Sequence, residues 1–371
     1  MRVLHVTAGL GEDAGQALVD LALAQRRAGH QVTIAADAAQ GRTGRAIELS
    51  LAGIPTYWVS DLTAHDLRRL ARAAVQLRDL LAPRHLDVVH AHAVAPAVAA
   101  RLALGDRHGV PVVQTVHGWG PRARAAASTD AVAALNLADA VVTASATMRD
   151  TLWGAGLTQA PVSVVPCGLP ALPGDTSDAP ASPDTAATAA TSASWTTRAR
   201  ASDDEVRHVR CLGTPHGEGR ALLGEALGTG LLDQVRLHGE PGGVWRCAPL
   251  SPADALVMTG CDDDSAYTVV GALRAGLALV VPDEPEILEL VDADTAYVFQ
   301  ARSAESLAAA LARALGEPPI DAAGRRARMR RRFAAAFSLD VVSAGYARVY
   351  DGARAERTRR QATVPALMAA R

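Results

Sequence analysis

Short, continuously apolar runs alternate with segments of helical periodicity along most of this chain. The first run is Arg2–Thr7, and in the segment after it Leu18, Leu21 and Ala22 recur on one side of a predicted helix. Strands buried on both faces of a parallel sheet show such runs, and the helices that cover them carry a single apolar stripe. The pattern therefore predicts an α/β fold with parallel strands.

The same pattern extends into both halves of the chain. Further strands are predicted at residues 29–35, 86–92, 109–118, 138–145, 162–168, 206–212, 255–258 and 277–281. Between the last two strands Val269, Val270 and Leu273 recur at helical spacing, and Gly276 stands where a helix-ending glycine is expected. Each half therefore has the strand, helix, strand order of a parallel α/β sheet.

Length and composition indicate how the chain is divided. A chain of 371 residues favours two domains, and a composition that is 49% hydrophobic but 4% aromatic indicates cores of Ala, Val and Leu. Residues 171–204 are mainly Ala, Thr, Ser, Pro and Asp, a composition that cannot offset its own ordering entropy. We expect an amino-terminal domain at 1–170, a linker at 171–204, a second domain at 205–335, and a crossing helix with a tail at 336–371.

The charge pattern argues against one class of partner. A net charge of −2 is not that of a nucleic-acid binder, which needs a basic excess. All 37 basic residues are Arg, so a phosphate group must be held by guanidinium groups, helix ends or backbone amides.

The 4 cysteines lack a metal-binding spacing, and neither a signal peptide nor a membrane-spanning run is recognisable. A cytoplasmic protein is expected.

An acidic loop joins the strand at 255–258 to the helix that follows it. Asp262, Asp263, Asp264 and Ser265 fall at the carboxyl end of this strand and at the amino end of the helix. Open α/β sheets bind ligands at such positions. Acidic residues at a helix start also serve as N-caps and stabilise the helix dipole, which is the simpler interpretation of these three carboxylates.

Three histidines follow predicted strands in the first half. His90 and His92 lie on the same side of the strand at 86–92, and His117 leaves the strand at 109–118 immediately before Gly118. A metal pair at His90 and His92 is one interpretation; a structural role is preferred, because no third ligand lies at a recognisable spacing. His117 is well placed to reach a substrate at the sheet edge.

A predicted helix at residues 64–81 carries a basic cluster. Arg68, Arg69 and Arg72 lie beside an apolar stripe that includes Leu70 and Leu77. Most such clusters are solvated helix faces. Basic amphipathic helices also bind anionic lipid headgroups, so peripheral contact with the inner face of a membrane is a second interpretation.

Several motifs, taken in order, resemble those of family-four retaining glycosyltransferases, which have the two-domain GT-B fold. They are Gly-His-Gln-Val from residue 29, Asp-Val-Val-His-Ala-His from residue 87, Val-Pro-Val-Val-Gln-Thr-Val-His-Gly from residue 110, Thr-Gly-Cys-Asp-Asp from residue 259, Gly-Ala-Leu-Arg-Ala-Gly from residue 271, and Glu-Leu-Val from residue 289. The resemblance implies two Rossmann-like, doubly wound domains that face each other across a cleft, with a shortened second domain.

The resemblance also implies roles for individual residues. His117 and Asp263 match positions beside the donor sugar and are the expected catalytic residues, and His90 and His92 lie on the acceptor side. Gly271 replaces a carboxylate that holds the donor ribose, and Thr214 and Glu218 replace two cations that hold the diphosphate, so Arg220 is the nearest cation that could substitute. The expected donor-binding residues are Gly15, Gly213, Thr214, Arg220, Asp264, Ser265, Ala266 and Gly271.

The function that this resemblance implies is transfer of a sugar from a nucleotide-sugar donor to a glycan, lipid or small-molecule acceptor, with retention and without a metal or cofactor. The main alternative is a catalytically weakened relative that binds a glycan, a nucleotide or a partner enzyme, since the expected Arg, Lys and Glu are missing. A sugar-nucleotide epimerase and a metal-dependent transferase are less favoured, because the first-domain motifs do not match the former and the latter has a single-sheet fold.

Overall fold

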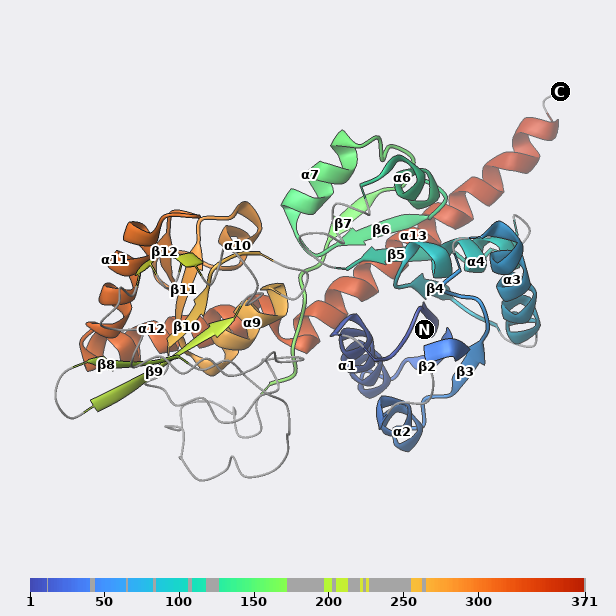
Figure 1. Cartoon of the computed structure of the whole chain (residues 1–371). Coiled ribbons are helices and arrows are strands. Elements are labelled where there is room, and N and C mark those ends of the chain that lie inside the picture. Colours follow the sequence, from blue (N-terminus) through green and yellow to red (C-terminus); the bar gives the residue numbers. More distant parts are fainter. Residues whose placement is uncertain are drawn as a thin grey trace. The chain divides into compact units, whose positions relative to one another are not determined.

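The structure is a computed structural model that describes residues 1–11, 13–40, 44–64, 66–82, 85–105, 109–117, 127–171, 197–201, 205–212, 221–222, 225–226, 255–261 and 265–369. The chain forms two compact units (Figure 1). The first combines Met1–Pro166 with Leu339–Arg371, and the second is Cys167–Ser338. The first unit is therefore built from both ends of the chain.

The first unit contains a parallel sheet in the order β3-β2-β1-β4-β5-β6-β7. Its strands are β1 (Arg2–Thr7), β2 (Gln31–Asp37), β3 (Thr56–Val59), β4 (Val88–Ala91), β5 (Val112–Val116), β6 (Ala140–Thr143) and β7 (Val162–Val164). Its helices are α1 (Asp13–Arg27), α2 (Gly44–Leu51), α3 (Leu67–Leu81), α4 (Val94–Leu104), α6 (Thr129–Leu135), α7 (Ala146–Gly154) and α13 (Leu339–Ala369). Chain order reverses between β1 and β4, as in doubly wound sheets.

Strand side chains alternate between two buried layers, which is why the strands are mainly apolar. On one face, Leu4 and Val89 pack with α3 and α4 through residues such as Leu70 and Ala100. The opposite face meets α1 and the long helix α13. Residues of α13 that pack there include Val342, Tyr346, Val349 and Tyr350. The carboxyl-terminal helix is thus part of the core of the first unit.

The second unit contains a five-stranded sheet in the order β12-β11-β10-β9-β8. Its strands are β8 (Thr197–Ala201), β9 (Glu205–Leu212), β10 (Ala255–Met258), β11 (Ala278–Pro282) and β12 (Tyr297–Phe299), and only the edge strand β8 pairs antiparallel. Its named helical segments are α9 (Ser265–Ala275), α10 (Pro285–Leu290), α11 (Ala304–Leu315), α12 (Pro319–Arg332) and the π-helical η3 (Phe333–Phe337).

The described part of this unit includes the end of the expected linker. Residues 197–201 lie within the expected linker at 171–204, yet they form β8 and pair with β9. The reason is that Thr197–Ala201 can satisfy its backbone hydrogen bonds along a sheet edge without contributing large apolar side chains. Residues 172–196 of the expected linker lie outside the described part of the chain.

The Arg-rich helix α12 does more than present charge to solvent. Arg332 donates to the carbonyl oxygens of Glu289 and Leu290 at the end of α10, and Arg330 donates to that of Ala275 at the end of α9. Cations near the last turn of a helix satisfy its unpaired carbonyl groups. These contacts attach α12 to its neighbours. Within the described residues, no helix combines the length and the apolar character needed to cross a bilayer.

Candidate functional site

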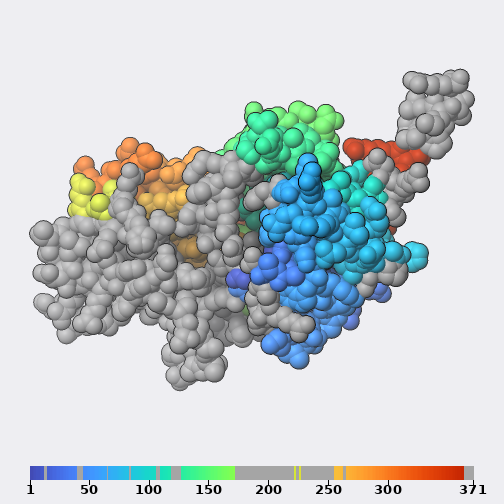
Figure 2. Space-filling model, turned by 45° about the vertical axis from the view of Figure 1, so that its right-hand side comes forward, coloured from blue at the N-terminus to red at the C-terminus, as the bar shows by residue number. Residues whose placement is uncertain are grey.

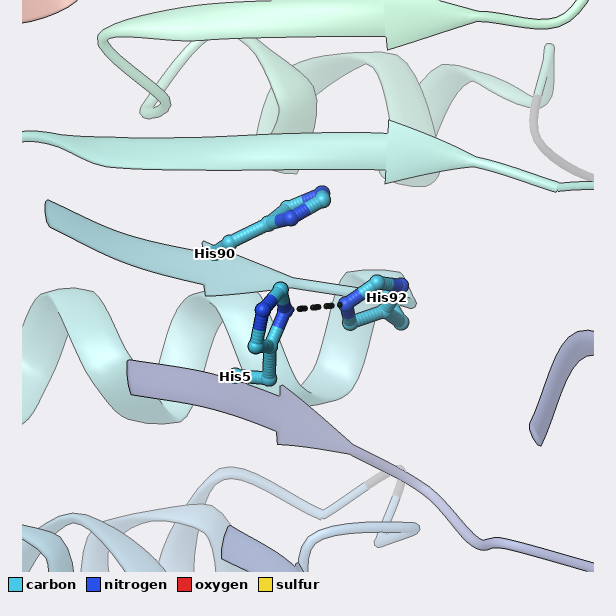
Figure 3. A group of neighbouring side chains, drawn as sticks. All are labelled: His5, His90 and His92. Carbon is cyan, nitrogen blue, oxygen red and sulfur yellow. Dashed lines mark hydrogen bonds between the residues drawn. The ribbon is translucent and has the colours of Figure 1, made fainter. Parts of the chain in front are cut away.

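Four histidines gather at the carboxyl ends of three neighbouring strands of the first sheet. His5 lies on β1, His90 on β4, and His92 and His117 directly follow β4 and β5. These strands flank the point where the strand order reverses, where doubly wound sheets bind ligands. Figure 3 shows three of the rings, those of His5, His90 and His92, beside one another on the sheet.

Strand alternation and register explain why these rings meet. Val3 pairs with Val88, and two residues later His5 pairs with His90, so both histidines project to the face covered by α1 and α13. Thr115 of β5 lies on the same face, because it contacts His90. This face is apolar near the amino ends of its strands and polar near their carboxyl ends.

Hydrogen bonds join the side chains in a series, and the first half of this series starts at His117. Nε2 of His117 lies 2.9 Å from Nδ1 of His92, and Nε2 of His92 lies 2.9 Å from Nδ1 of His5. Nε2 of His5 then lies 2.8 Å from Oε1 of Gln25, a residue of α1 that is 1% exposed. The partly buried His117 is thereby connected to the interior of the unit.

The second half of this hydrogen-bond series reaches the carboxyl-terminal helix α13. Nε2 of Gln25 donates to the hydroxyl of Tyr350 at 3.1 Å, and this hydroxyl lies 2.7 Å from Nδ1 of His90. Nε2 of His90 lies 2.6 Å from the hydroxyl of Thr115, which donates to the hydroxyl of Tyr346 at 3.4 Å. We refer to these connected side chains as the histidine network: His117, His92, His5, Gln25, Tyr350, His90, Thr115 and Tyr346.

Burial keeps the inner histidines neutral. It lowers the pKa of His5 to about 4, an effect that the hydrogen bond with Gln25 opposes in part. The pKa of His90 also lies well below its usual value, first because of burial and then because of His5 and His117. The same causes, with His90 added, lower the pKa of His92. Each of these three rings is therefore an uncharged imidazole near neutral pH.

The histidines also form the one metal-ligand cluster found among the described residues. One nitrogen from each of His5, His90 and His92 lies within 4.8 Å of the others. The sequence interpretation set a metal aside because a third ligand was missing, and His5 supplies that third ligand. A different observation now argues against an ion, since both nitrogens of each ring already have a hydrogen-bond partner. Metal binding would have to break several of these bonds.

Gly15, a predicted donor-side residue, lies in the first turn of α1 and packs against the loop that precedes this helix. A Cβ atom at Gly15 would lie 2.6 Å from the carbonyl carbon and 2.9 Å from the carbonyl oxygen of Leu10. The guanidinium of Arg45 donates to the same Leu10 oxygen at 2.7 Å. Only glycine allows the backbone to pass this close, so this structure explains Gly15 by packing, whatever ligand the loop holds.

The predicted donor-side residues of the second unit are only partly described. Ser265, 2% exposed, begins α9 after β10, and Ala266 and Gly271 of the same helix are also buried. Gly271 therefore brings no polar group to this helix. The predicted residues Gly213, Thr214, Arg220, Asp263 and Asp264 lie outside the described part of the chain.

Sequence reasoning missed five members of the network: His5, Gln25, Thr115, Tyr346 and Tyr350. The available signal for His5 was its alternation with Val3, which places it level with His90 once β1 and β4 are paired. No comparable signal exists for the tyrosines, because Tyr350 and His90 are 260 positions apart.

One known family resembles most of the first unit in sequence. Residues 14–171 match the sequence model of Glycosyltransferase Family 4. The larger part of the first unit thus resembles family-four glycosyltransferases in sequence. The match covers β2, β4 and β5, with His90, His92 and His117, whereas His5 precedes it. No curated protein matches the chain.

Solved glycosyltransferase structures share the fold over nearly the whole chain. Anabaena Alr3699/HepE in complex with UDP-glucose is 15% identical, with 95% of this chain and 100% of that chain covered and a TM-score of 0.64. A glycosyltransferase from Rickettsia africae ESF-5 is 13% identical, with coverage of 95% and 98% and a TM-score of 0.61. Sucrose-phosphate synthase from Thermosynechococcus elongatus is 12% identical, with coverage of 96% and 100% and a TM-score of 0.60. Together with the two sheets, these likenesses show that the chain has a GT-B fold.

Proposed function

We propose that this protein is a retaining glycosyltransferase that moves a hexosyl group from a nucleotide-sugar donor to a glycan, lipid or small-molecule acceptor. The observation that carries the proposal is the gathering of His90, His92 and His117 at the strand-order reversal of a family-four-type unit. HepE, which shares the fold, was solved with UDP-glucose, and this supports a nucleotide sugar as the donor.

The proposed mechanism needs neither a metal nor a cofactor. Retaining transfer develops positive charge on the sugar and negative charge on the leaving phosphate, so the enzyme acts through positioning and preorganised polar groups. In this proposal His117 and Asp263 lie beside the sugar. With no lysine in the chain, Arg220 and backbone amides near Gly213 and Ser265 hold the diphosphate.

A panel experiment tests this function. Calorimetric titration with nucleotide diphosphates and nucleotide sugars should reveal one donor that binds below millimolar concentration, and NMR of the product should show that the anomeric configuration is retained, with and without EDTA. His117→Ala and Asp263→Asn should each lower turnover roughly 100-fold or more. Arg220→Ala should mainly weaken donor binding, and the exposed His85→Ala serves as the control.

A catalytically weakened binding protein is the second candidate. The observation that favours it is the buried Gly271, at a position where family-four enzymes carry a ribose-binding glutamate. A wild-type protein that binds a nucleotide sugar but transfers nothing supports this candidate. Absence of both binding and transfer across the whole panel contradicts both the transferase and the nucleotide-binding forms.

Contact with a lipid-linked acceptor at the inner face of a membrane is a finer part of the proposal. Helix α3, in the blue part of the chain, lies on the surface of the first unit (Figure 2), and its Leu67 is 70% exposed. Arg69 and Arg72 form ion pairs with Asp61, which reduces the charge they offer to lipid. Co-sedimentation with anionic vesicles, compared with zwitterionic ones, tests this contact.

A further inference from the structure

The histidine network has few ways to arrange its protons. A neutral imidazole has one donor and one acceptor nitrogen, and a hydroxyl that accepts one hydrogen bond donates its single proton to another. The direction of each bond therefore determines the direction of the next. Only two arrangements satisfy every bond, and they run in opposite directions along the whole network.

The amide of Gln25 decides between these arrangements. Its Oε1 faces His5 and can only accept, so Nε2 of His5 carries the proton and Nδ1 of His5 must accept. The ring of His92 then donates through Nε2 and accepts through Nδ1. His117 must consequently donate to His92 through its own Nε2.

The Nε2 atom of Gln25 orders the other half in the same way. It donates to Tyr350, so the tyrosine hydroxyl donates to Nδ1 of His90. His90 then donates through Nε2 to Thr115, whose hydroxyl donates to Tyr346. All four histidines thus carry their proton on Nε2, the tautomer that neutral histidine prefers in water, whereas the reversed arrangement would place all four protons on Nδ1.

The geometry points to Gln25 as a positioning residue that, through His5 and His92, holds His117 in the Nε2–H tautomer. Nδ1 of a neutral His117 then carries the lone pair and can accept, but not donate, a hydrogen bond. Only one consequence rests on the proposed function, namely that a sugar hydroxyl could donate to this nitrogen. The tautomer itself is a property of the protein without substrate.

Substitutions at Gln25 separate the two halves of the network. In Gln25→Glu an ionised carboxylate accepts on both sides, so Tyr350 must donate to it and His90 must move its proton to Nδ1. In Gln25→Lys an amine donates on both sides, so His5, His92 and His117 must move their protons to Nδ1 while His90 keeps Nε2–H. Tyr350→Phe removes the link between the halves and should leave the tautomers of His5, His92 and His117 unchanged.

The experiment is long-range ¹H–¹⁵N NMR of the full chain labelled with ¹⁵N-histidine, with the four rings assigned by single His→Gln variants. The expected wild-type spectrum at neutral pH shows Nε2–H in His5, His90, His92 and His117, and His90 switches in Gln25→Glu. If Gln25→Lys does not fold, the wild type and Gln25→Glu still decide. An Nδ1–H ring in the wild type, or an unchanged His90 in Gln25→Glu at a pH where ¹³C shifts show the glutamate to be ionised, would overturn the inference.

Two further measurements keep the alternatives apart. One equivalent of Zn²⁺ should leave the ring signals unchanged, and a zinc-dependent shift of His5 and His92 would instead assign the cluster to a metal and overturn the inference. A transfer assay on the same wild-type sample reports on the proposed function alone. If the wild type shows the predicted tautomers but no transfer activity, the proposed transferase function is wrong and the inference about Gln25 stands.

Discussion

At the scale of single residues, the buried histidines make the free energy of unfolding depend on pH. The folded pKa of His5 is about 4, and an unfolded histidine titrates near 6.5. The unfolded state therefore takes up its proton first as the pH falls. Stability contributed by neutral His5 is fully present above about pH 6.5 and is lost as the pH falls toward about 4.

The expected loss follows from the shift in pKa. A depression of about 2.5 units corresponds to about 3 kcal/mol of unfolding free energy between pH 6.5 and 4. Urea unfolding at several pH values should show this slope, which His5→Gln should make shallower. In the exposed control His85→Gln the slope should stay as steep as in the wild type. An equally steep slope in His5→Gln would contradict the assignment.

The Gly15 position offers a second residue-scale test. Gly15→Ala places a methyl group against the Leu10 backbone, where a Cβ would lie 2.6 Å away, so the loop or helix α1 must move. Overpacking of this kind costs about 1–3 kcal/mol of unfolding free energy. Gly11→Ala, in the loop just before α1, is the control, because no atom lies within 4 Å of the added Cβ. Equal stability of the two variants would show that the close approach is not maintained.

At the scale of elements, one carboxylate joins β5, α4 and α13. Asp139 is 4% exposed, and it accepts a hydrogen bond from the backbone amide of Val112 at 2.8 Å. Arg101 of α4 lies 3.6 Å from it and Arg357 of α13 lies 3.4 Å from it. Two cations from separate helices thus converge on one buried carboxylate.

Removing this charge should uncouple the helices. Asp139→Asn keeps the shape but removes the carboxylate charge that faces Arg101 and Arg357, and a broken buried ion pair typically costs about 3–5 kcal/mol. Thermal and urea unfolding measure the loss, with the exposed Asp150→Asn as the control. A change below about 1 kcal/mol would mean that solvent already screens these charges.

Elements with a strong period were predictable from sequence, whereas contacts between distant elements were not. The bounds of β1 and β10 agree with the apolar runs, because a doubly buried strand leaves a continuous signal. His5 was hidden inside such a run, and its role depends on register with β4. Strand β8 lacked any apolar signal, because an edge strand needs only backbone pairing. Tyr346 and Tyr350 fall within the expected crossing helix at 336–371. Their contact with His90 depends on how α13 packs on the sheet, which the sequence pattern does not show.

At the scale of the whole molecule, the first unit is discontinuous and the second is continuous. Helix α13 completes the first unit: Tyr350 is 1% exposed, Tyr346 is 6% exposed, and both belong to the histidine network. The chain passes between the units at two points that lie side by side, since Leu169 forms a parallel bridge with Ser338 and its amide donates to the Phe337 carbonyl at 3.1 Å. The second unit can therefore be replaced by a short connection.

This arrangement predicts how fragments behave. Residues 1–166 alone lack α13 and leave part of the sheet face around Val3, Val88 and Val113 uncovered, although α1 remains. Because each large buried side chain contributes about 1.5–3 kcal/mol, the loss is on the order of the whole stability of a domain. The same residues joined to 339–371 by about four Gly and Ser residues should fold cooperatively, since short connections suffice between adjacent chain ends.

Circular dichroism and urea unfolding distinguish the two fragments, and ¹⁵N-histidine NMR shows whether the network has formed. We expect a sigmoidal transition and four Nε2–H rings in the linked fragment, and a featureless, non-cooperative response in residues 1–166. A linked variant with Tyr350→Ala separates the contribution of this side chain from that of the remaining helix. Cooperative unfolding of residues 1–166 at the stability of the linked fragment would show that the carboxyl-terminal helix only rests on a unit that is already complete.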